Sequence, residues 1–128
     1  MEKLIVIKGD PNSGKTTAIR CLLNVLLCDG ARLFPCEYSN LDFKGDFNVM
    51  LEYKGKRVVL CSGGDLLREV LGNVSTYAGK CDVLIIASRH FALDRHLGEY
   101  NMHICEKERY DDYQKLIDFV KGIIATLL

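Results

Sequence analysis

Residues 4–16 read LIVIKGDPNSGKT, a short apolar run followed by a glycine-rich segment. The run at residues 4–7 has the length and composition of a parallel strand that is buried on both faces. Residues 9–16 fit the pattern G-x-x-x-x-G-K-[ST] without a mismatch. From residue 15 onward, apolar residues recur at helical spacing until Asp29-Gly30, where a helix is expected to end. The stretch therefore predicts a strand, a turn and a helix in direct succession.

The residue types in this loop suit contact with a polyphosphate. Backbone N–H groups of the loop and of the helix N-terminus supply donors that converge on one point. The Lys15 ammonium suits a position between the β- and γ-phosphates, and the Thr16 hydroxyl suits a magnesium ion. Because its carboxylate would repel a γ-phosphate, Asp10 is expected either to point outward or to orient a water molecule or a second substrate. The predicted nucleotide-binding residues are Gly9, Asp10, Pro11, Asn12, Ser13, Gly14, Lys15, Thr16 and Thr17.

In these residues the sequence resembles the P-loop NTPases, a superfamily that includes nucleoside kinases and small GTPases. The specific resemblance covers residues 9–17, and the order of strands and helices extends it over the rest of the chain. It implies a three-layer α/β/α sandwich that binds a magnesium–nucleoside triphosphate complex at the C-terminal ends of its strands. ATP is favoured over GTP, because the sequence lacks the Asn-Lys-x-Asp run with which small GTPases recognise guanine.

The rest of the chain alternates between strand-like and helix-like segments. Residues 47–53 and 57–61 form a hairpin in this interpretation, with Gly55 at positive φ between them. The run at 83–87 is the most apolar and is expected at the sheet centre. The expected elements are strands at 4–7, 31–36, 47–53, 57–61, 83–87 and 101–105 and helices at 15–28, 66–74, 91–98 and from 109 to the C-terminus. The pattern predicts an α/β fold with a mostly parallel sheet of five to six strands and one hairpin strand.

The length indicates one domain over residues 1–128, which the loop pattern predicts to be a nucleotide-binding domain. The 17 basic and 17 acidic side chains cancel, which argues against nucleic-acid binding and leaves a protein partner or a homodimer open. No apolar run reaches the roughly 18 residues of a membrane span, and the first residues do not resemble a signal peptide. The six cysteines include no Cys-x-x-Cys pair, which favours buried, reduced thiols. These features predict a cytoplasmic protein.

One expected acid is missing. P-loop NTPases usually carry Asp or Glu at the end of a buried strand, where it helps to hold magnesium. Here the run at 83–87 continues as Ser88-Arg89, and the run at 57–61 continues as Ser62-Gly63-Gly64-Asp65. Asp65 is a candidate for supporting the metal or orienting water, or it caps the following helix. Ser62 is a second candidate for the metal.

Other charged residues follow expected strands. If residues 31–36 form a parallel strand, Glu37 faces the nucleotide crevice as a base for an acceptor hydroxyl; otherwise it is a solvated loop acid, and Asp42 is a weaker version of the same idea. Arg89 either neutralises charge on the transferring phosphoryl group or lies on the surface. Lys107 and Arg109 follow the last expected strand, where members of the superfamily often contact the base, or they belong to a solvated charge cluster.

Two functions from different classes remain. The first is a magnesium-dependent hydrolase or kinase-like phosphotransferase, in which Lys15, Asp65, Glu37 and Arg89 carry the chemistry. The lack of a long lid insertion favours hydrolysis over transfer. The second is a nucleotide-dependent switch with little turnover that acts through a partner protein, and the missing acid favours it.

Overall fold

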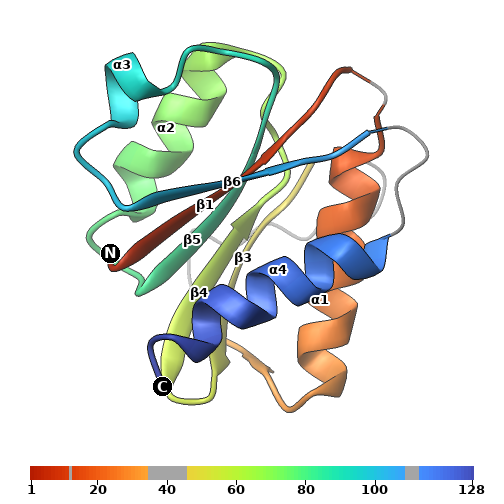
Figure 1. Cartoon of the computed structure of the whole chain (residues 1–128). Helices are drawn as coiled ribbons and strands as arrows, with labels where there is room; N and C mark the ends of the chain where they lie inside the picture. Colours follow the sequence, from red (N-terminus) through yellow and green to blue (C-terminus); the bar gives the residue numbers. More distant parts are fainter. Residues whose placement is uncertain (12, 35–45, 109–112) are drawn as a thin grey trace.

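Strands and helices alternate along the chain around one sheet (Figure 1). The computed structural model describes residues 1–11, 13–34, 46–108 and 113–128. Within these ranges the fold is a mixed α/β fold with a six-stranded sheet and four helices. The elements are, in order, β1 (Lys3–Lys8), α1 (Lys15–Cys28), β2 (Arg32–Leu33), β3 (Asn48–Tyr53), β4 (Lys56–Cys61), α2 (Leu67–Tyr77), β5 (Val83–Ser88), α3 (Asp94–Leu97), β6 (Met102–Glu106) and α4 (Tyr113–Ala125).

The sheet has the strand order β2-β3-β4-β5-β1-β6. Strand β1 lies between β5 and β6 and is parallel to both, with Ile5 opposite Ile85 and His103. Strand β4 is parallel to β5, whereas β3 is antiparallel to β4 and to β2. The C-terminal ends of β1, β4, β5 and β6 therefore meet at one edge of the sheet. Because β3 runs the other way, its N-terminal end lies at this same edge.

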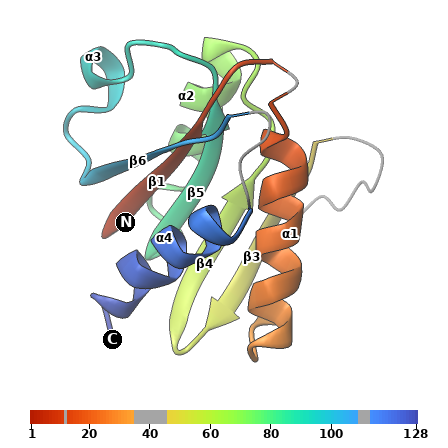
Figure 2. The ribbon, with the colours of Figure 1, turned by 45° about the vertical axis from the view of Figure 1, so that its right-hand side comes forward.

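Helices cover both faces of the sheet, which is the middle one of three layers (Figures 1 and 2). Helices α1 and α4 pack on the face that carries Ile5 and Ile7 of β1. Helix α2 and the segment around α3 pack on the face that carries Leu4 and Val6. All four strand residues are fully buried, which explains why the run at 4–7 is continuously apolar rather than alternating. Each such side chain contributes about 1.5–3 kcal/mol when it leaves water.

The hairpin is confirmed, with a shorter turn than the sequence suggested. Strand β3 ends at Tyr53 and β4 begins at Lys56, so the turn consists of two residues. Lys54 has φ 50° and Gly55 has φ 81°. Two positive φ values in succession are the geometry of a type I′ turn, whose twist matches that of the paired strands.

The strand expected at residues 31–36 is the least accurate of the predicted elements. Strand β2 covers Arg32–Leu33 only and lies at the sheet edge, antiparallel to β3. The Phe34 N–H still donates to the Met50 carbonyl at 2.8 Å, and residues 35 and 36 lie outside the described residues. The edge position agrees with the proline at residue 35. Glu37 was expected at the end of a parallel strand, and that premise is wrong because β2 is antiparallel to β3. Glu37 itself lies outside the described residues.

The helices agree in position but differ in length. Helix α2 extends to Tyr77, and α3 spans only Asp94–Leu97. Helix α4 ends at Ala125, and residues 109–112, where it was expected to begin, lie outside the described residues. Among the residues that the structure describes, none of the helices combines the length and apolar character that a bilayer crossing requires.

The five described cysteines are free, as expected, but they are not all buried. Cys61, Cys81 and Cys105 are buried, whereas Cys28 is exposed and Cys21 is partly exposed. Burial raises the pKa of the Cys61 thiol above its usual range and that of Cys81 to about 12. Both thiols are therefore protonated and unreactive at neutral pH.

Candidate functional site

The segment at residues 9–16, hereafter the glycine loop, leaves the sheet at the C-terminal end of β1. The Gly9 N–H donates to the Ser88 carbonyl of β5 at 3.0 Å, and the Ser13 N–H donates to the Asp10 carbonyl at 3.2 Å. Gly14 has φ 88°, a left-handed conformation that glycine adopts without strain, and it precedes the first residue of α1. The first turn of α1 carries no acidic residue. No carboxylate of the helix itself therefore offsets the positive end of its dipole.

Lys15 is buried under the glycine loop and is 7% exposed. Its ammonium donates to the Gly9 carbonyl at 3.0 Å and to the Asp10 carbonyl at 2.7 Å. The pKa of Lys15 is lowered, mainly because burial disfavours the charged ammonium and also because the Arg89 guanidinium is near. The Asp65 and Asp10 carboxylates oppose this shift without cancelling it. A buried ammonium is costly unless an anion accompanies it. The site therefore favours a bound anion next to Lys15.

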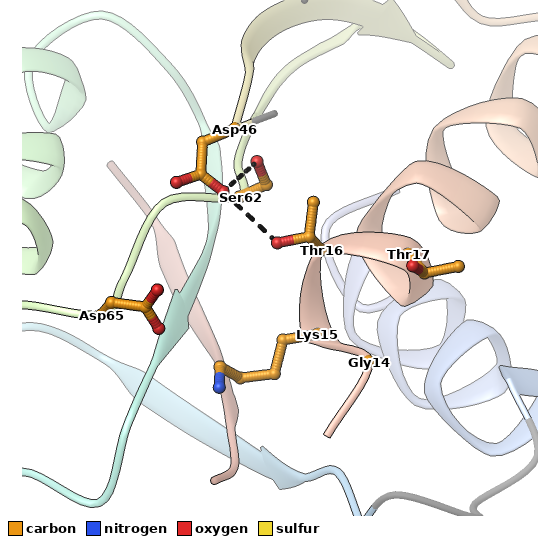
Figure 3. A pocket seen from close by; sticks show the side chains of 7 residues that line it. All are labelled: Gly14, Lys15, Thr16, Thr17, Asp46, Ser62 and Asp65. Carbon is orange, nitrogen blue, oxygen red and sulfur yellow. Dashed lines mark hydrogen bonds between the residues drawn. The ribbon is translucent and has the colours of Figure 1, made fainter. Parts of the chain in front are cut away.

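A pocket of about 360 Å³ opens in front of Lys15 (Figure 3). Its volume lies within the range of roughly 300–1,000 Å³ that small-molecule sites occupy. Thr16, Ser62 and Asp46 lie together on one side of it, and Thr17 lies on the far side of Thr16 from Asp46. The lining residues are Gly14, Lys15, Thr16, Thr17, Asp46, Ser62 and Asp65. The predicted residues Lys15, Thr16, Ser62 and Asp65 thus meet in one pocket.

Asp46 is the residue that the sequence pattern did not reveal. The Thr16 hydroxyl donates to Asp46 Oδ1 at 3.3 Å, and the Ser62 hydroxyl lies 3.5 Å from the same oxygen. The Phe47 N–H donates to Ser62 Oγ at 2.7 Å and fixes that hydroxyl beside the carboxylate. Asp46 reaches the pocket because it precedes an antiparallel strand, whose N-terminal end lies where the parallel strands end. The predicted hairpin at 47–61 was the available signal.

Asp65 and Arg89 form an ion pair at the rim of the pocket. Arg89 Nε lies 3.3 Å from Asp65 Oδ1, with the side chains 40% and 61% exposed. The Arg89 N–H also donates to the Gly64 carbonyl at 3.3 Å. Helix α2 begins after Leu66 and receives no side-chain capping bond, so the alternative of Asp65 as a helix cap is wrong. Arg89 remains partly exposed, and its partner is a carboxylate of the site.

The turn at residues 62–65 is held tightly against β5 and α2. A Cβ on Gly64 would lie 2.0 Å from the Ala87 carbonyl oxygen, so only glycine fits at this close approach. The Asn73 side-chain amide of α2 donates to the Gly63 carbonyl at 3.0 Å. These contacts fix the position of Ser62 and Asp65 relative to the glycine loop.

Lys107 holds the glycine loop through a hydrogen bond to its backbone. It follows β6, is 4% exposed, and its ammonium donates to the Ser13 carbonyl at 3.0 Å and to the Glu108 carbonyl. The Lys107 carbonyl also lies 2.5 Å from where a Cβ on Gly9 would be. The alternative of a solvated charge cluster is therefore wrong for Lys107, whereas Arg109 lies outside the described residues.

Two further loop residues bear on the site. The Ser13 hydroxyl is buried and has no hydrogen-bond partner among the described residues. A buried hydroxyl without a partner costs about 1–3 kcal/mol, which a phosphate oxygen would offset. The Asp10 side chain is 80% exposed and its Oδ1 lies 3.1 Å from His90 Nε2, so it points outward as expected. Pro11 is exposed, and Asn12 lies outside the described residues, as do Glu37 and Asp42.

The donor set fits magnesium better than a metal that needs a protein cage. In the described ranges, no group of three or more His, Cys, Asp or Glu side chains converges on one point. Thr16, Asp46 and Ser62 supply one carboxylate and two hydroxyls. Magnesium commonly takes one or two carboxylates, with water and substrate phosphates completing its shell.

Comparisons of this chain with protein-family models, with curated protein sequences and with solved structures found no match.

Proposed function

We propose that this chain binds a nucleoside triphosphate with Mg²⁺ through the glycine loop and cleaves its γ-phosphate by transfer to water or to a hydroxyl acceptor. The observation that carries the proposal is the juxtaposition of buried Lys15 with the Thr16–Asp46 contact in one pocket. In this proposal the three-layer fold is a variant of the P-loop NTPase fold. ATP is the favoured nucleotide, because the sequence lacks the guanine-recognition run.

The phosphates would interact with hydrogen-bond donors of the glycine loop and of the first turn of α1. The Lys15 ammonium bonds two loop carbonyls, and its geometry allows it to turn toward phosphate oxygens instead. The Ser13 hydroxyl and the N-terminal N–H groups of α1 add neutral donors. Because the loop is anchored by Lys107 and by the Ser88 carbonyl, these donors are held in place before the ligand arrives.

Thr16 and Asp46 would hold the Mg²⁺ ion, with Ser62 supporting Asp46. When bound, this ion neutralises charge on the β- and γ-phosphate oxygens. Asp46 replaces the acid that the sequence lacks after a parallel strand. Its carboxylate would take that role from just before β3, where it lies next to the Ser62 hydroxyl.

Asp65 and Arg89 would act on the γ-phosphate side of the pocket. Arg89 follows β5 and can stabilise charge that develops on the transferring group. Asp65 can orient the attacking water or hydroxyl. Their ion pair favours a second function, because a γ-phosphate would compete with Asp65 for Arg89. A nucleotide-dependent switch, in which this exchange signals to a partner protein, is that second candidate.

A calorimetric titration followed by a phosphate-release assay tests the proposal. The protein is titrated with ATP and then with GTP in the presence of Mg²⁺, and release of inorganic phosphate is measured with the nucleotide that binds. We expect binding and slow release, and Asp65→Asn should reduce release far more than affinity. Binding without any release would favour the switch. Binding of neither nucleotide would refute the proposed function.

A further inference from the structure

A second cavity lies next to the phosphate pocket and shares Asp46 with it. It has a volume of about 240 Å³ and is lined by Asp46, Phe47, Asn48, Gly63, Glu69 and Asn73. We propose that this cavity is the acceptor subsite and that it binds a small cationic compound carrying a hydroxyl group. The inference rests on the proposed function, because it places the acceptor beside the γ-phosphate of a nucleotide in the first pocket.

The two carboxylate oxygens of Asp46 face different cavities. Oδ1 faces Thr16 and Ser62 in the phosphate pocket, at 3.3 and 3.5 Å. Oδ2 lies 3.3 Å from the position that a Cβ on Gly63 would occupy, and Glu69 Oε2 lies 3.1 Å from that same position. The absence of a side chain at Gly63 therefore leaves a space that two carboxylates border. A group bound in this space would contact Oδ2 of Asp46, whose Oδ1 lies at the proposed metal position.

The residues that line the cavity favour a positively charged ligand. Asp46 and Glu69 supply two negative charges, and the described residues that line this cavity include no Lys, Arg or His. Asn48 and Asn73 add hydrogen-bonding amides, and the Asn73 amide already donates to the Gly63 carbonyl. An ammonium group bound here is attracted to both carboxylates, whereas an anion is repelled.

The volume of the cavity suits a small acceptor. At about 30 Å³ for each water in the liquid, the cavity corresponds to about eight water molecules. A compound with a few carbons, an amine and one or two hydroxyls fits this space. The sequence lacks a long lid insertion, which by itself favours water as the acceptor. An acceptor that fills this cavity would displace water from it, so transfer to a hydroxyl would not require a lid.

The transfer step uses groups already on the two cavities. The acceptor hydroxyl oxygen forms a bond to the γ-phosphorus, and the bond from that phosphorus to the β,γ-bridging oxygen breaks. The electron pair of the broken bond leaves with the nucleoside diphosphate. The hydroxyl proton passes to the Glu69 carboxylate, while Asp46 stays in contact with Thr16.

Three small probes of similar size test the charge preference. Serinol carries an ammonium and two hydroxyls, glycerol is neutral, and glycerate is an anion. Each is titrated into the full-length, MgADP-loaded protein, and the amide resonances of Gly63 and Asn73 are followed by NMR. We expect serinol to shift them saturably and to bind at least about fivefold more tightly than glycerol. Equal shifts with glycerate, or no shift with serinol, would overturn the inference.

Variants locate the binding. Gly63→Ala places a methyl group between the carboxylates, and Glu69→Gln removes one charge; each should weaken serinol at least about fivefold. The controls are Gly72→Ala, where a Cβ meets nothing within 4 Å, and Glu99→Gln at an exposed position. Serinol affinity that is unchanged in both Gly63→Ala and Glu69→Gln would also overturn the inference.

A product assay and a nucleotide titration separate the two proposals. With ATP and saturating serinol, mass spectrometry should detect a phosphate ester of serinol, and inorganic phosphate as the sole product would contradict the transfer step. If MgATP binds but serinol does not, the acceptor subsite fails while the proposed function stands. If the protein shows no affinity for ATP or ADP, the proposed function itself fails.

Discussion

The Thr16 hydroxyl donates a 3.3 Å hydrogen bond to the Asp46 carboxylate, and this contact joins the first turn of α1 to a residue two positions before β3. The two residues are 30 positions apart in the chain. They meet because β3 is antiparallel and begins at the edge of the sheet where β1 ends. Thr16 and Asp46 are the pair to which we assign the Mg²⁺ ion.

Lys15→Ala tests the assignment of the phosphate-binding group. We expect a loss of MgATP affinity of at least about a hundredfold, because charge-assisted hydrogen bonds to phosphate disappear. The fold should remain intact, because removing a buried charge offsets the loss of its hydrogen bonds to the Gly9 and Asp10 carbonyls. Calorimetry measures the affinity and circular dichroism the fold. Lys115→Ala, at an exposed position of α4, is the control, and retained affinity in Lys15→Ala would remove Lys15 from the site.

Lys107→Met tests whether this second buried lysine positions the glycine loop. The variant keeps the length of the side chain but removes the donor to the Ser13 carbonyl. We expect the free energy of unfolding to fall by about 1–3 kcal/mol, because a buried acceptor loses its partner. MgATP affinity should fall as well, by at least about fivefold, since the loop loses its anchor. Lys115→Met is the matched control. Unchanged stability and affinity would reduce Lys107 to a packing residue.

Gly64→Ala tests the close approach between the turn at 62–65 and β5. The new Cβ would lie 2.0 Å from the Ala87 carbonyl oxygen, so the backbone has to shift. We expect a loss of about 1–3 kcal/mol in the free energy of unfolding, measured with urea. In Gly79→Ala the Cβ meets nothing within 4 Å, and stability should change little. Equal stability of the two variants would contradict the observed packing.

Tyr53 gives the fold a pH dependence far from the site. Its hydroxyl donates to Asp29 Oδ2, and burial together with this bond raises the pKa of Tyr53 to about 12. A pKa raised above the unfolded value of 10.0 means that the contribution to stability is complete below pH 10 and is lost as the pH rises toward 12. An absorbance titration should show a late tyrosine transition near pH 12, and Tyr53→Phe should remove its contribution. Titration of all tyrosines together near their usual pKa would refute this.

The nature of each signal explains what the sequence predicted and what it did not. The loop pattern at 9–16 and the apolar run at 4–7 are local, so they predicted β1, the glycine loop and α1 correctly. The glycine at residue 55 between two β-like runs is an equally local signal and predicted the hairpin, although the turn is one residue shorter than expected. Asp46 has no local signal, because its role depends on where an antiparallel strand begins in the sheet.

The sequence also did not predict which polar residues are buried. Lys107 stands among charged neighbours in the sequence, which indicated a solvated cluster, yet it is buried against the glycine loop. The pairing of Asp65 with Arg89 likewise required knowing that β4 and β5 are adjacent. Strand adjacency and burial are properties of the whole sheet, and no short pattern carries them.

The dissociation constant for ATP, measured with and without Mg²⁺ in the unmodified protein and in Asp46→Asn, tests the central claim most directly. The control is Asp118→Asn, whose carboxylate accepts a hydrogen bond from Gln114 on α4. We predict that Mg²⁺ tightens ATP binding at least about tenfold in the unmodified protein and in the control, and that Asp46→Asn loses most of this gain. An ATP affinity that does not respond to Mg²⁺, or a full response in Asp46→Asn, would contradict the account.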